Sequence, residues 1–163
     1  MLDRALAGLA RLCTGLGAVS LLVMMLATDY DIAARWAANR PLHGVVEIVE
    51  IMVLATAMLG LPEAFLRSEQ IQVDLFDTIL PAGILRGVKV AALLLTIVFL
   101  ALLCRNVTAP MMDARTFGDM KPDLGMPVWP LYALILFSFT ASVLTCAGAI
   151  IRLATGGPEE ARI

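Results

Sequence analysis

Four long apolar stretches run through this chain, and they constrain its fold more than any other feature. They lie at about residues 5–28, 45–66, 82–104 and 126–151. A lipid bilayer has a hydrocarbon core of about 30 Å, which about 20 residues of apolar helix can cross. We therefore predict an all-α integral membrane protein with four transmembrane helices, folded as a single membrane domain over residues 1–163.

The composition agrees with a membrane protein and argues against several other classes. Hydrophobic residues make up 60% of the 163 residues and charged residues only 16%, with a mean hydropathy of +0.88. Soluble domains are about half apolar and about a quarter charged. The net charge of -2 is spread along the chain without a basic or acidic tail. The sequence therefore indicates neither nucleic-acid binding nor a charged interaction tail.

No catalytic or metal-binding pattern stands out in the sequence. The three cysteines, Cys13, Cys104 and Cys146, lie in apolar runs without a C-x-x-C motif, which is typical of small buried side chains. The single histidine, His43, cannot build a catalytic triad or a histidine-rich metal site within the chain. We therefore expect no enzyme activity, no cofactor and no metal site.

The second stretch is unusual because three glutamates, Glu47, Glu50 and Glu63, interrupt it, and Pro62 lies near its end. Ionisable residues inside a membrane are costly and are functional candidates by default. Glu47 and Glu50, at i and i+3, share one helix face. They could form a proton or cation site, make a polar contact to another membrane subunit, or lie at the membrane interface. The last two interpretations are favoured, because the middles of the other stretches offer no ionisable partner.

The basic residues favour a topology with both termini in the cytoplasm. Four crossings place both ends on one side, and cytoplasmic loops carry an excess of Lys and Arg. In this orientation seven basic residues lie inside: Arg4, Arg11, Arg67, Arg86, Lys89, Arg152 and Arg162. Five basic residues lie outside: Arg35, Arg40, Arg105, Arg115 and Lys121.

Two loops would then face the outer side. The first, residues 29–42, contains a helix-prone run with Trp36 that could form a short interfacial helix, which Pro41 would end. The second, residues 105–128, is rich in Gly and Pro, and we expect an irregular segment that leads to Trp129. Trp36 and Trp129 are predicted to anchor the chain at the membrane interface.

Small residues at four-residue spacing predict faces where helices approach closely. Ser138 and Ser142 form such a pair in the last stretch, and Thr56 and Gly60 form one in the second. We expect these residues to make helix contacts, but the spacing alone identifies no partner.

A junction after the second stretch carries a resemblance to a known family. The resemblance rests on short charged, apolar and proline motifs in and around this junction: Glu50, Arg67, Ile71-Gln72-Val73-Asp74-Leu75, Leu80-Pro81 and Arg86. Gly118 and Pro127-Val128-Trp129 extend the pattern to the fourth stretch. Together the motifs resemble the small membrane subunit, of DctQ type, of tripartite ATP-independent periplasmic (TRAP) transporters. Gln70 departs from the family pattern, which usually has His there, so we expect hydrogen bonding rather than imidazole chemistry at this position.

The resemblance implies a non-catalytic subunit in the bacterial inner membrane that scaffolds a large multi-span membrane subunit. A periplasmic binding protein would deliver an organic acid, and an ion gradient would drive its uptake. Substrate and ion sites belong to the large subunit in this family, so no substrate-binding residue is expected here. Membrane lipid is a further expected partner.

The resemblance also suggests roles for individual residues. Arg67 and Asp74 would fix the turn after the second stretch, by ion pairing or by binding lipid phosphate. Glu50 would hydrogen-bond across a helix interface, within this subunit or to the large one. Charged residues of the two outer loops would help to dock the binding protein: Arg35, Arg40, Arg115, Asp119 and Lys121.

The main alternative is a self-sufficient transporter that works as a homodimer and uses Glu47 or Glu50 to couple to protons. This alternative predicts transport by the chain alone, whereas the scaffold interpretation predicts none without the large subunit.

Overall fold

The computed structural model describes residues 2–39, 41, 43–66 and 82–155. Four α-helices account for most of them: α1 (Leu2–Ala38), α2 (Val45–Leu66), α4 (Ala82–Phe117) and α5 (Trp129–Thr155). Each helix contains a stretch that is long and apolar enough to cross a membrane. This finding confirms the predicted all-α, four-span fold.

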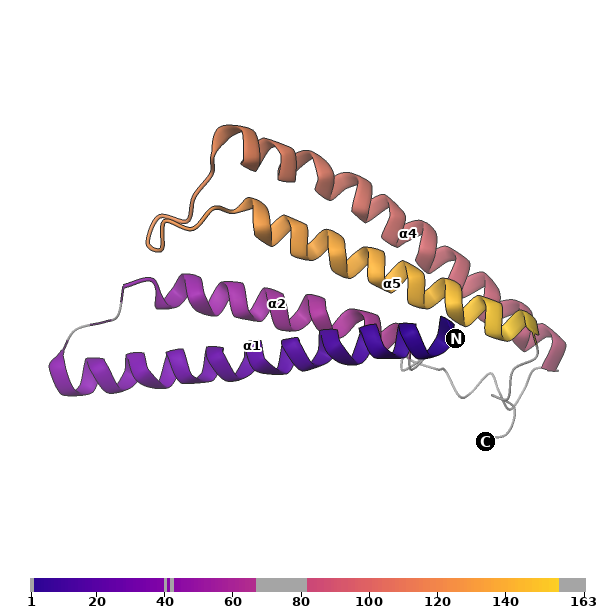
Figure 1. Cartoon of the computed structure of the whole chain (residues 1–163), viewed down its shortest axis with the longest axis horizontal. Helices are drawn as coiled ribbons and strands as arrows, with labels where there is room; N and C mark the ends of the chain where they lie inside the picture. Colours follow the sequence, from indigo (N-terminus) through magenta and orange to yellow (C-terminus); the bar gives the residue numbers. More distant parts are fainter. Residues whose placement is uncertain (1, 40, 42, 67–81, 156–163) are drawn as a thin grey trace.

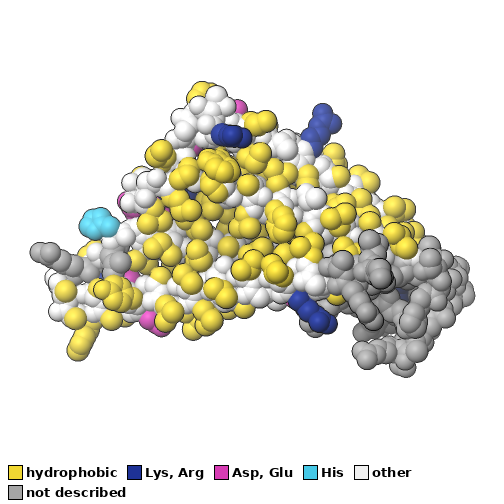
Figure 2. All heavy atoms as spheres, in the orientation of Figure 1, with side chains coloured by type: hydrophobic (Ala, Val, Ile, Leu, Met, Phe, Trp, Pro, Cys, Tyr) yellow, Lys and Arg dark blue, Asp and Glu magenta, His cyan; other side chains and the backbone are white. Residues whose placement is uncertain are grey.

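The helices lie side by side in an open layer rather than in a closed bundle (Figure 1). Along the layer the order is α1, α2, α5 and α4, so the two helical hairpins meet through α2 and α5. Within the described residues α4 contacts only α5, while α1 contacts α2 extensively and α5 slightly. The face of the layer that Figure 2 shows is largely apolar, and many large hydrophobic side chains of the described residues are exposed.

The two ends of the layer differ in what they contain. The connection between α1 and α2 and the connection between α4 and α5 lie together at the left of Figure 1. We call this the loop end of the layer. The N-terminus of α1 lies at the opposite end.

Two helices are longer than a membrane crossing requires. α1 has 37 residues and α4 has 36, so each extends about 55 Å at about 1.5 Å per residue, against a bilayer core of about 30 Å. The short interfacial helix considered for residues 29–42 is the end of α1 itself, which runs on to Ala38. An ion pair between Asp31 Oδ2 and Arg35 Nη2, 2.6 Å apart, lies in this extension. Its alanines also favour the helical state.

The irregular segment predicted at residues 105–128 begins later than expected. α4 continues through Pro110 and ends at Phe117. Proline removes one backbone donor, but the Ala, Met and Arg residues around it are good helix formers. The prediction is therefore wrong for residues 105–117, and irregular structure is found only after Phe117.

The buried core lies where α1, α2 and α5 meet. Cys13, Ala55 and Leu59 are buried there, and Leu9 and Leu134 pack against them. Small side chains at such positions let the helix backbones approach closely, and close packing is a main source of helix association in a membrane. This core holds the α1–α2 hairpin against α5.

Hydroxyl groups connect the helices within this region. Thr56 Oγ1 on α2 donates to the carbonyl oxygen of Gly17 on α1 at 3.2 Å. Ser138 Oγ on α5 donates to the carbonyl oxygen of Met58 on α2. Ser142 Oγ donates to the backbone carbonyl oxygen of Ser138 within α5, at 2.8 Å. Both serines are fully buried, so this pair of small residues packs inside the chain rather than on an exposed face.

Candidate functional site

The connection between α4 and α5 folds into a tight hairpin, residues 118–128, which we call the hairpin loop. The Lys121 N–H donates to the carbonyl oxygen of Met126 at 2.8 Å, and the Val128 N–H donates to that of Asp119 at 3.0 Å. An isolated antiparallel bridge joins the two arms between these bonds. The backbone pairing gives the loop a defined shape.

Two glycines allow the chain to turn at the base and at the tip of the hairpin loop. Gly118 follows the end of α4 with a φ of 69°, and the next N–H, of Asp119, donates back to Ala114 at 3.1 Å. This is the Schellman arrangement that commonly ends a helix. Gly125, near the tip, has a φ of 62°. Glycine adopts this left-handed conformation at little cost, unlike residues with a Cβ.

Glu47, in the first turn of α2, holds the tip of the hairpin loop. Its Oε1 accepts a hydrogen bond from the backbone N–H of Asp123 at 3.2 Å, and its Oε2 accepts one from that of Leu124 at 2.9 Å. Only 7% of Glu47 is exposed. Hydrogen bonds from backbone N–H groups to a carboxylate are charge-assisted and stronger than neutral ones. The buried carboxylate therefore fixes two consecutive N–H groups of the loop.

Glu50, one turn further along α2, forms an ion pair with the same loop. Its Oε2 lies 2.6 Å from Lys121 Nζ. The Lys121 side chain is only 17% exposed, whereas the Glu50 side chain is 63% exposed. The two glutamates, which share one helix face, thus both bind the hairpin loop. We call Glu47 and Glu50 the carboxylate clamp.

Gly44, just before α2, lies close to the tip of the hairpin loop. Its φ is 80°, and a Cβ added there would lie 2.9 Å from Leu124 Cδ2 and 3.8 Å from Asp123 Cβ. Its carbonyl oxygen accepts the Ile48 N–H at 3.0 Å, so Gly44 also caps α2. A residue with a Cβ at this position would force the Leu124 side chain to move.

The aromatic residues at the loop end have different surroundings. The guanidinium of Arg115, near the end of α4, lies 6.0 Å from the centroid of the Trp129 ring at the start of α5, within the range of a cation–π contact. Trp129 is 42% exposed, and Trp36 near the end of α1 is 90% exposed. Both predicted anchors therefore lie at the loop end with much of their surface accessible.

The structure brings some of the sequence-predicted site residues together and separates others. Lys121 pairs with Glu50, Asp119 lies exposed in the hairpin loop, and the Arg115 guanidinium lies over the Trp129 ring. Arg35 lies in the last turn of α1, a helix with no contact to α4 among the residues described, and forms its ion pair with Asp31 there. The remaining predicted residues lie outside the described ranges: Arg40, Arg67, Gln70 and Asp74.

Sequence reasoning missed the carboxylate clamp as a unit. Glu47 accepts hydrogen bonds from backbone N–H groups that lie 76 and 77 residues later in the chain. Almost every residue has a backbone N–H, so residue types cannot reveal this contact. One signal could have found the Glu50 contact: Lys121 is the only basic residue between Arg115 and the fourth predicted span. A lone lysine in such a loop is a natural partner for an acidic pair at the membrane boundary.

The arrangement positions the hairpin loop against the start of α2. Each acidic side chain of the clamp engages the hairpin loop. Among the residues that the structure describes, no three His, Cys, Asp or Glu side chains gather as metal ligands. The clamp fixes the relative placement of α2, α4 and α5 at the loop end.

Comparison with known proteins gives one family assignment. The family described as "Tripartite ATP-independent periplasmic transporters, DctQ component" matches residues 24–156. A comparison with curated proteins gives no significant match. The matched range includes α2, α4, α5 and the hairpin loop, and it starts within α1.

Proposed function

The chain belongs to the DctQ component family of tripartite ATP-independent periplasmic transporters, and from this premise we propose that it scaffolds the large multi-span membrane subunit of such a transporter. A periplasmic binding protein delivers an organic acid to the assembly, and an ion gradient drives its uptake. The chain lies in the inner membrane with both termini in the cytoplasm. We assign it no catalytic role and no substrate site.

The open layer is the observation that carries this proposal. α4 contacts only α5 among the described parts of the chain, and its exposed large side chains include Leu95 and Phe99. Extended apolar surface of this kind fits either lipid or another membrane protein. A flat layer exposes the sides of its long helices to a partner, whereas a closed bundle would bury them against one another.

The carboxylate clamp favours a scaffold over the alternative of a self-sufficient proton-coupled transporter. Transport pathways usually bring polar groups or broken helices to the middle of the membrane. Glu47 and Glu50 lie instead in the first turns of α2, and both bind the hairpin loop. Their contacts serve to hold a loop in place, which is what a rigid platform requires.

The loop end is the surface that we assign to docking of the binding protein. With both termini in the cytoplasm, four crossings place the loop end on the periplasmic side. The candidate docking residues that the structure describes lie there: Arg35, Arg115, Asp119 and Lys121. Arg35, Arg115 and Asp119 are exposed, whereas the Lys121 side chain is only 17% exposed, so we expect the first three to be more available to a partner protein.

A gene deletion tests the scaffold role. Cells that retain the large subunit and the binding protein but lack this chain should lose uptake of the organic acid, and a plasmid copy of the chain should restore it. The amount of large subunit in the membrane is measured in parallel. Full uptake without the chain, at an unchanged level of large subunit, would contradict the proposal.

A further inference from the structure

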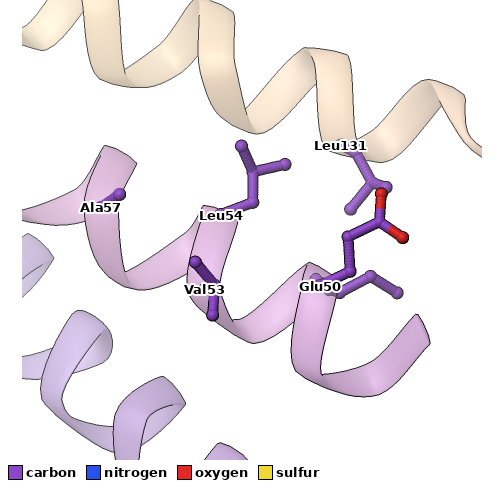
Figure 3. A pocket seen from close by; sticks show the side chains of 6 residues that line it. Glu50, Val53, Leu54, Ala57 and Leu131 are labelled. Atoms are coloured by element: carbon purple, nitrogen blue, oxygen red, sulfur yellow. The ribbon is translucent and has the colours of Figure 1, made fainter. Parts of the chain in front are cut away.

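An apolar groove lies between α2 and α5, next to the carboxylate clamp (Figure 3). It has a volume of about 320 Å³. Six residues line it: Glu50, Ile51, Val53, Leu54, Ala57 and Leu131. In Figure 3 Leu54 from α2 and Leu131 from α5 point into the space between the helices, and the Glu50 carboxylate lies beside Leu131. The groove is thus aliphatic with one charged end.

The size of the groove suits a single flexible chain better than a helix. A volume of 320 Å³ lies at the lower end of the range of about 300–1,000 Å³ found for small-molecule pockets. The lining residues from Glu50 to Ala57 span about 10 Å along α2. A transmembrane helix is itself about 10 Å across with its side chains, so it cannot enter a space of this volume. Part of a lipid acyl chain can.

Glu50 forms the charged end of the groove, and Lys121 of the hairpin loop contacts Glu50 there without lining the groove itself. Glu50 is 63% exposed in its side chain, and only its Oε2 is used by Lys121. A lysine ammonium has three donors, and the contact with Glu50 uses one of them. An exposed carboxylate beside a lysine ammonium complements a ligand that carries an N–H cation and an anion close together.

We propose that this groove binds one acyl chain of an aminophospholipid, with the lipid ammonium donating to Glu50 and the lipid phosphate accepting from Lys121. A choline headgroup lacks N–H donors for the carboxylate. A glycerol headgroup has no cation, so its net negative charge would meet Glu50 unfavourably. The groove therefore selects phosphatidylethanolamine over phosphatidylcholine and phosphatidylglycerol. This inference does not depend on the scaffold role.

Native mass spectrometry of the purified full-length chain tests the headgroup selection. After delipidation, titration with phosphatidylethanolamine should give a one-lipid complex at a concentration at least fivefold lower than titration with phosphatidylcholine. Glu50→Gln should remove this difference by weakening phosphatidylethanolamine alone. Asp113→Asn, an exposed acid on α4, is the matched control and should keep the selectivity. Equal binding of both lipids by the wild type would overturn the proposal, as would full selectivity in Glu50→Gln.

A second pair of variants tests the groove itself. Ala57→Phe places a ring in the groove and should lower retention of the first lipid at least fivefold. Leu95→Phe adds a ring on the open face of α4, where Leu95 is 72% exposed, and should leave retention unchanged. Far-ultraviolet circular dichroism confirms that both variants keep their helices. Equal retention by both variants would overturn the groove assignment.

Crosslinking in native membranes tests the alternative occupant, a protein segment. A photoreactive diazirine side chain in place of Leu54, which lines the groove, should form an adduct whose added mass is that of phosphatidylethanolamine. A dominant adduct with another protein would show that a side chain of a partner fills the groove, and it would overturn the lipid proposal.

Discussion

The carboxylate of Glu47 accepts a hydrogen bond from the backbone N–H of Leu124 at 2.9 Å, and so ties the first turn of α2 to the tip of a loop 77 residues later in the chain. The same carboxylate accepts the N–H of Asp123. One buried side chain thereby fixes how the α4–α5 hairpin meets the α1–α2 hairpin at the loop end. This rigid connection supports the scaffold proposal.

Glu47→Gln should loosen the tip of the hairpin loop. The amide retains one oxygen acceptor and gains two donors, so one of the two backbone N–H groups loses its partner, at a cost of about 1–3 kcal/mol. Hydrogen–deuterium exchange should become faster at residues 123 and 124. Asp113→Asn on α4 is the control that should leave this exchange unchanged. Unaltered exchange in Glu47→Gln would show that the clamp does not hold the loop.

The ion pair between Glu50 and Lys121 should make a small, salt-dependent contribution. Partly exposed pairs contribute about 0.2–1 kcal/mol in double-mutant cycles, and added salt screens them. We expect Glu50→Ala and Lys121→Ala to show a coupling of this size in the free energy of unfolding, measured in mixed detergent micelles. The coupling should shrink at high ionic strength. Strictly additive effects at low salt would mean that the contact contributes nothing to the free energy of unfolding.

Gly44→Ala should destabilise the loop end through two separate effects. The left-handed backbone at a φ of 80° costs about 1–2 kcal/mol for a residue with a Cβ, and the new Cβ would lie 2.9 Å from Leu124 Cδ2. A double variant with Leu124→Ala should recover the part due to crowding and keep the part due to the backbone. Gly8→Ala, where an added Cβ meets no atom within 4 Å, is the control. Thermal unfolding measures all three, and an unchanged midpoint for Gly44→Ala would contradict the geometry.

Ser138→Ala should weaken the contact between α5 and α2. The hydroxyl donates to the carbonyl oxygen of Met58, and hydrogen bonds between membrane helices contribute about 0.6 kcal/mol on average and up to about 2 kcal/mol. Thr140→Ala is the matched control, because Thr140 is exposed and its hydroxyl donates within α5 to Leu136. Unfolding in detergent should therefore be easier for Ser138→Ala than for Thr140→Ala. Equal stability of the two variants would refute a specific role for Ser138.

The sequence could predict the number and type of the helices because a membrane crossing has a characteristic length and hydropathy. It could not predict how far α1 and α4 extend. Hydropathy falls where a helix leaves the lipid, but the helix continues while its residues favour it, as they do from Asp29 to Ala38 in α1. The change from apolar to charged residues marks the membrane boundary rather than the end of the helix.

The candidate site was only partly predictable for a different reason. Glu47 and Glu50 were identifiable as costly charges next to the membrane. Their partners were not, since Glu47 binds backbone N–H groups and the hairpin loop acquires its shape from Gly118 and Gly125. The roles predicted for Arg67, Gln70 and Asp74 remain predictions, because these residues lie outside the described ranges.

The central claim is that this chain supports transport without performing it, and uptake into proteoliposomes tests that claim most directly. Liposomes with this chain alone, with the large subunit alone, and with both are compared in the presence of the binding protein, radiolabelled organic acids and an imposed ion gradient. Our account predicts no uptake by this chain alone and full uptake only when both membrane subunits are present. Gradient-driven uptake by liposomes that contain only this chain would contradict it.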